Sequence, residues 1–186
     1  MNIGLYVTLI GQILGIVAVI LGFVSFQVST AKKLLAVQTA ACTVFCLHYL
    51  LIGATSAFVL NAVGIVRNVV YYHRNKRELS GKGVPILFAV IMAVLGVFSW
   101  QGIYSLLVIV GLVINTVCLS FKNPQNIRKS ILVSSPLVLL YDVCVLSVGG
   151  IIYESVAIIS AVIGMVRTSA KHSDESMFSE EEGKQI

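Results

Sequence analysis

The stretch Gly83–Phe121 reads GVPILFAVIMAVLGVFSWQGIYSLLVIVGLVINTVCLSF and contains no Asp, Glu, Lys or Arg. About 20 apolar helical residues cross the ~30 Å hydrocarbon core of a bilayer, so this stretch has room for two crossings. The polar pair Trp100–Gln101 lies where the first crossing would end. We therefore predict two membrane helices here, over 84–100 and 102–121.

The same apolar character extends over the whole chain. Of its 186 residues, 58% are hydrophobic and only 11% are charged, whereas a soluble domain carries about 25% charged residues. This composition excludes a soluble enzyme, a nucleic-acid-binding domain and a secreted disulfide scaffold. The apolar runs do not alternate with polar residues as barrel strands do, and a helix satisfies its own backbone in lipid. The predicted fold class is an all-α integral membrane protein that has the lipid bilayer as its partner.

Hydropathy predicts seven transmembrane helices, over 3–26, 34–53, 56–72, 84–100, 102–121, 130–148 and 150–166. All thirteen Lys and Arg residues lie in or beside alternate connections of this set, or at its C-terminal end. Positive residues favour the cytoplasmic side. We therefore predict an N-terminus outside and a C-terminus in the cytoplasm, and we interpret the net charge of +5 as a topology signal that predicts no nucleic-acid partner.

The two ends of the helix set carry similar short motifs. Ser25–Phe26 and Ser120–Phe121 each precede a pair of basic residues, and GIVRN at 64–68 matches GMVRT at 164–168. These matches predict a 3+1+3 architecture, which is a parallel repeat of three-helix bundles. The expected division is 1–73 for the first repeat, 74–101 for a basic loop and linker helix, 102–167 for the second repeat, and 168–186 for a disordered cytoplasmic tail that is rich in acidic residues.

Two blocks of the chain resemble the Imp-YgjV family of bacterial inner-membrane proteins. The first block runs from Lys32 to Asn68 and carries Gln38, His48–Gly53, Asn61 and Arg67; the second, SVGGIIYESVAIISAVIGMVR at 147–167, carries the Gly-Gly pair, Glu154 and Arg167. That family is similar to the SWEET (MtN3-like), PQ-loop and PnuC-type transporters. The resemblance implies the bacterial inner membrane, two three-helix bundles and transport of a small solute. The chain departs from the PQ-loop pattern, because 3–26 contains no Pro and Pro124–Gln125 falls in an expected loop.

Four polar side chains are predicted at a similar depth, in the outer third of the membrane: His48, Asn61, Asp142 and Glu154. Ionisable groups are costly in a bilayer, so they indicate a function. The functional hypothesis is a cavity open to the outside, where His48 and a carboxylate share a proton and Asn61 binds the solute. The structural alternative is that the carboxylates reach interfacial water and His48 bonds a neighbouring helix.

Other polar and small residues have simpler interpretations. Gln12 and Asn115 either line the solute path or hydrogen-bond between helices. Arg67 and Arg167 are expected to be structural or to extend to lipid phosphates. Gly11 and Gly15 form a GxxxG pattern, which indicates close helix packing.

The sequence carries no catalytic motif, so we expect no enzymatic activity, no cofactor and no metal site. The first function hypothesis is a transporter or facilitator of a small polar solute, with or without coupling to a proton. The alternative is a non-transporting receptor, regulator or assembly protein of the same fold. The identity of the solute and a homo-oligomeric state remain open.

Overall fold

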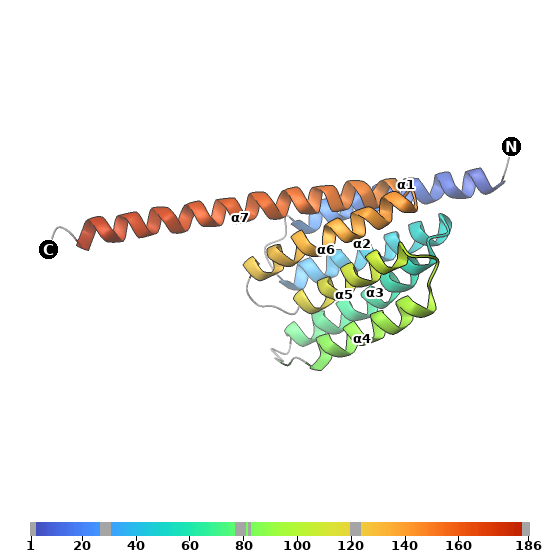
Figure 1. Cartoon of the computed structure of the whole chain (residues 1–186), viewed down its shortest axis with the longest axis horizontal. Helices are drawn as coiled ribbons and strands as arrows, with labels where there is room; N and C mark the ends of the chain where they lie inside the picture. The colour runs from blue at the N-terminus through green and yellow to red at the C-terminus, as the bar shows by residue number, and fades with distance from the viewer. Residues whose placement is uncertain (1–2, 27–30, 77–80, 82, 120–123, 184–186) are drawn as a thin grey trace.

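The computed structural model describes residues 3–26, 31–76, 81, 83–119 and 124–183, and within them it contains helices and connections but no strand. The seven helices are α1 Ile3–Phe26, α2 Ala31–Leu51, α3 Thr55–Lys76, α4 Gly83–Phe98, α5 Ser105–Cys118, α6 Pro124–Cys144 and α7 Val148–Gly183. They lie side by side along the long axis of the molecule (Figure 1). The prediction of an all-helical protein with a break near Trp100–Gln101 is therefore confirmed.

The packing of the described helices closes a ring. Helix α2 packs against α1 and α3, α6 packs against α5 and α7, and α1 contacts α7. Helix α3 contacts both α4 and α5. Figure 1 shows α4 at the edge of the bundle farthest from α1 and α7.

The outer surface of this bundle is apolar. Among the exposed side chains are Leu9 and Ile13 on α1, Leu87 and Val90 on α4, and Ile163 on α7. A soluble monomer rarely exposes contiguous apolar surface on this scale, so the surface is suited to lipid. Two helical stretches, Gly4–Val24 and Val148–Val166, are long and apolar enough to cross a membrane, and the shorter apolar stretches are Ala36–Leu51, Gly83–Phe98 and Ser105–Cys118.

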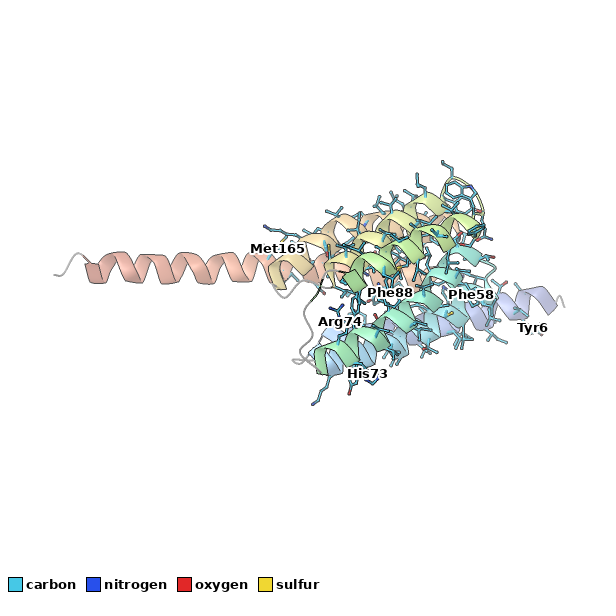
Figure 2. All side chains as sticks on the ribbon, turned by 90° about the horizontal axis from the view of Figure 1, so that it is seen from below. Tyr6, Phe58, His73, Arg74, Phe88 and Met165 are labelled. Atoms are coloured by element: carbon cyan, nitrogen blue, oxygen red, sulfur yellow. The ribbon has the colours of Figure 1, made fainter. Side chains whose placement is uncertain are left out.

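Basic residues gather at one end of the bundle. Figure 2 shows Tyr6 and Phe58 toward one end, whereas His73 and Arg74, at the end of α3, lie toward the other. Lys33 and Lys129 lie near the starts of α2 and α6, which are at the same end as His73 and Arg74 because consecutive helices run in opposite directions. The described part of the chain thus agrees with the charge pattern from which the topology was predicted.

The connections at the opposite end are tied together by hydrogen bonds. The Gln101 side-chain nitrogen donates to the Gly53 carbonyl at 2.9 Å, and its oxygen accepts from the Ser56 backbone N–H at 3.2 Å. The Gln12 nitrogen donates to the Leu146 carbonyl at 2.7 Å, and the Val148 N–H donates to the Gln12 oxygen at 3.1 Å. Gln12 on α1 therefore binds the connection between α6 and α7 through two hydrogen bonds.

Two helices differ from the expected bounds by more than four residues at one end. Helix α7 continues to Gly183, where a disordered tail was predicted after 167, and it projects beyond the bundle (Figure 1). The chain has no Pro after Pro136 and no Gly between Gly164 and Gly183, so nothing interrupts the helix. Helix α6 begins at Pro124, which was expected in a loop; Pro suits the first turn of a helix because its missing N–H needs no partner there.

Candidate functional site

A cavity of about 80 Å³ lies inside the ring of helices. Its walls come from α2 to α7, with Met92 as the contribution of α4. Apolar side chains such as Phe45, Leu60 and Val138 form part of the lining. Six amide, acidic or basic side chains also line it: Gln38, Asn61, Arg67, Asn68, Asn115 and Glu154.

Arg67 is the cation of this cavity, and its side chain is only 4% exposed. Its Nε and Nη2 donate to Asn68 Oδ1 at 3.1 and 2.9 Å, and its Nη1 donates to Thr116 Oγ1 at 2.7 Å. Of the two expectations for Arg67, these contacts fit the structural one, because the guanidinium is hydrogen-bonded to neutral partners inside the bundle. The side chain of Arg167 lies outside the described residues.

The partners of Arg67 are themselves fixed. Asn68 is fully buried, and its Nδ2 donates to Cys42 Sγ on α2 at 3.7 Å. Thr116 is also fully buried, and its hydroxyl donates to the Leu112 carbonyl one turn earlier at 2.7 Å. The guanidinium is therefore held between α3 and α5 by groups that cannot turn freely.

Asn61 and Glu154 line the same cavity from α3 and α7. Asn61 Nδ2 donates to the Ala57 carbonyl of its own helix at 2.9 Å. Glu154 is hydrogen-bonded to the side chain of Ser135 on α6. Asn115, on α5, also lines the cavity, whereas Gln12 does not.

His48 and Asp142 are fully buried but do not line this cavity. His48 Nδ1 lies 2.7 Å from the Gly11 carbonyl oxygen of α1, and its Nε2 lies 2.7 Å from Ser147 Oγ. A carbonyl oxygen can only accept, so Nδ1 carries a proton, and the neutral ring accepts from the Ser147 hydroxyl at Nε2. Ser147 Oγ in turn accepts from the Gly150 N–H at 3.1 Å.

Tyr49 connects the cavity, which Asn61 and Glu154 line, to the buried carboxyl group of Asp142. It lines the cavity, and its hydroxyl donates to Asp142 Oδ1 at 2.8 Å. The second carboxyl oxygen, Oδ2, is buried without a hydrogen-bond partner among the described residues. Gly150 lies against this carboxyl group, so closely that a side chain there would collide with it.

The structure thus divides the four residues expected in one outer cavity into two pairs. Asn61 and Glu154 share the cavity, while His48 and Asp142 belong to packed hydrogen-bonded contacts between α1, α2, the end of α6 and the start of α7. The GxxxG prediction is confirmed, because Gly11 packs on α2 and Gly15 approaches both His48 and the backbone of Gly149.

Sequence reasoning missed several groups at the site, among them Asn68, Thr116 and the Tyr49 hydroxyl. Asn68 directly follows Arg67 within the repeated motif, which was the available signal. Thr116 and Tyr49 look like ordinary helix residues in an apolar run, and only their packing reveals their partners.

The family model of the Imp-YgjV bacterial inner membrane proteins matches residues 9–172. The chain belongs to the Imp-YgjV family. This match covers every residue of the cavity and of the His48 network. Because the family consists of bacterial inner membrane proteins, this protein is one of them. Neither the curated proteins nor the solved structures contain a significant match.

Proposed function

We propose that this Imp-YgjV protein is a transporter or facilitator that moves a small polar solute through the cavity inside its helix ring. The observation that carries the proposal is the polar lining of that cavity in a bundle whose outer surface is apolar. Charged and amide side chains inside a membrane are expensive, and in membrane proteins they mark solute and ion pathways. Arg67, Asn68 and Asn115 extend the polar lining along α3 and α5 toward the basic end of the bundle, which supports a path that continues to that side.

The proposal includes the 3+1+3 architecture. The halves would be α1–α3 and α5–α7, with α4 as the linker, and each half has its middle helix packed between the other two. The cavity then lies between the halves, since α2 and α3 line one side of it and α5 to α7 the other. Binding near the midplane between repeats is characteristic of transporters built from parallel repeats.

Alternating access would require the contacts between the halves to open on one side at a time. At the end proposed to face outward, the Tyr49–Asp142 and His48–Ser147 hydrogen bonds join α2 to the second half. We propose that these two bonds break when the cavity opens to the outside. Asp142 and His48 are also the groups that would carry a proton if transport is coupled, and an imposed pH gradient across liposomes would then drive uptake.

The alternative function is a non-transporting receptor or regulator, and one observation favours it. Helix α7 projects beyond the bundle to Gly183 and offers a long helical surface to a cytoplasmic partner. The two functions differ in whether solute crosses the membrane.

Flux through the purified protein tests the proposal. The protein would be reconstituted into liposomes and screened with radiolabelled sugars, nucleosides, amino acids and hydroxy acids. A transporter moves at least one solute faster than protein-free liposomes do. If a folded and monodisperse preparation transports no solute of any of these classes, the result would favour the receptor or regulator function.

A further inference from the structure

Within the described part of the chain, the cavity contains a buried cation without an ion-pair partner. Arg67 lines the cavity and is 4% exposed, and its hydrogen bonds go to the neutral groups of Asn68 and Thr116. No described carboxylate forms an ion pair with it. A buried charge needs a partner of opposite charge to offset its desolvation.

The guanidinium of Arg67 has further N–H donors with which it could bind such a partner. A guanidinium has five N–H donors, and three of them are used by Asn68 and Thr116. Within the described residues, one N–H on each terminal nitrogen is left without an acceptor. Two parallel donors of this kind match the two oxygens of a carboxylate.

An acceptor atom without a hydrogen-bond partner among the described residues lies in the wall of the same cavity. Gln38 Oε1 is buried and has no hydrogen-bond partner among the described residues. An amide oxygen can only accept, so a ligand that satisfies it must bring a hydroxyl or amino donor. The carboxyl group of Glu154 is another acceptor in the lining, and when ionised it would repel a second anionic group on the ligand.

The size of the cavity limits the ligand. An apolar cavity of about 150 Å³ holds benzene, and this one measures about 80 Å³. The cavity has about half the volume of one that holds the six carbon atoms of benzene, so the ligand has fewer than six non-hydrogen atoms, on the order of three to five.

We propose that the cavity binds a two-carbon monocarboxylate that carries a hydroxyl or amino group, with its carboxylate on Arg67 and its donor on Gln38. This inference rests on the proposed function, because it names the solute class for that same cavity. Glycolate represents the hydroxy acids, and glycine represents the amino acids.

Equilibrium binding to the full-length protein in nanodiscs tests the inference independently of transport. We expect glycolate or glycine to bind at least tenfold more tightly than acetate, which lacks the donor, and glycolamide, which lacks the charge. Malate, which is larger and has a second carboxylate, and inorganic phosphate should also bind at least tenfold more weakly. Equal binding of acetate, glycolamide or phosphate would overturn the inference.

Substitutions at two residues assign the contacts. Gln38→Leu should reduce the preference for glycolate over acetate to about twofold or less while acetate binding persists. Arg67→Gln should weaken binding of every carboxylate at least tenfold. Arg67→Lys keeps the positive charge but lacks the paired guanidinium donors, so it should weaken binding less. Arg74→Gln is the matched control, because Arg74 lies on the same helix and outside the cavity.

The outcomes separate the two proposals. Binding of the hydroxy or amino acids without flux in liposomes would support the inference and contradict transport. Flux of a neutral solute with no carboxylate binding would support transport and contradict the inference. If Arg67→Gln does not fold, Arg67→Lys and the ligand series on the native protein still decide the result.

Discussion

The Nε2 atom of His48 lies 2.7 Å from the hydroxyl oxygen of Ser147, and both side chains are fully buried. This bond connects α2 to the residue that precedes α7. The other ring nitrogen of His48 bonds the backbone of α1. One side chain therefore holds three segments together at the end of the bundle where Tyr6 and Phe58 lie.

Replacing His48 should strongly destabilise the fold. His48→Ala removes both ring hydrogen bonds, leaves the Ser147 hydroxyl without its acceptor, and creates a cavity. We expect a loss of about 2 to 4 kcal/mol, measured by thermal or denaturant unfolding in detergent. His73→Ala is the control, because His73 is exposed and should change stability by less than about 0.5 kcal/mol. Equal stability of the two variants would contradict the role assigned to His48.

Gly150 is predicted to tolerate no side chain. A Cβ atom at this position would meet the carboxyl group of Asp142, which is itself fully buried. Gly150→Ala should cost about 1 to 3 kcal/mol through overpacking. Gly83→Ala is the control, since a Cβ atom added there would have no neighbour within 4 Å. The comparison requires only unfolding midpoints, and a neutral Gly150→Ala would show that α7 can shift at little cost.

The Tyr49–Asp142 hydrogen bond should show coupling in a double-mutant cycle. Tyr49→Phe removes the hydrogen bond to Asp142 Oδ1 and should cost about 1 to 3 kcal/mol. Combining it with Asp142→Leu removes the buried polar group as well, so the double variant should lose less stability than the sum of the single variants. Additive losses, measured by unfolding in detergent, would indicate that the two side chains do not interact.

Much of the fold follows from the sequence, because charge-free runs and helix lengths are local properties. The break near Trp100–Gln101 was predictable from two polar residues between long apolar runs. The continuation of α7 was not, since acidic composition suggested disorder although no residue after Gly164 interrupts the helix before Gly183.

The site was harder to predict than the fold. Position along a helix gives the depth of a side chain, and depth placed His48, Asn61, Asp142 and Glu154 together. Depth does not give the direction in which a side chain points, and helices that are apolar on every face carry little signal for that direction. The structure supplies it: Asn61 and Glu154 face the cavity, whereas His48 and Asp142 face the contacts between helices.

The proposed orientation predicts which ends of the helices can be labelled from outside the cell. In a variant with its four native cysteines replaced, Thr55→Cys at the start of α3 should react with a membrane-impermeant thiol reagent added to the periplasm. His73→Cys, at the basic end of the same helix, should react only after the inner membrane is opened. The reversed pattern would contradict an N-terminus outside. Both native side chains are exposed, so access to the reagent depends on the side of the membrane.

Filling the cavity is the most direct test of whether solute passes through it. Gly64 lines the cavity, and a Cβ atom added there would have no neighbour closer than 3.8 Å, so Gly64→Leu should occupy the space without disrupting the backbone. Gly83→Leu adds the same side chain outside the cavity. For the solute that the native protein moves in liposomes, we predict that Gly64→Leu lowers the flux at least tenfold and that Gly83→Leu leaves it unchanged. Undiminished flux through a folded Gly64→Leu protein would contradict the claim that this cavity is the path.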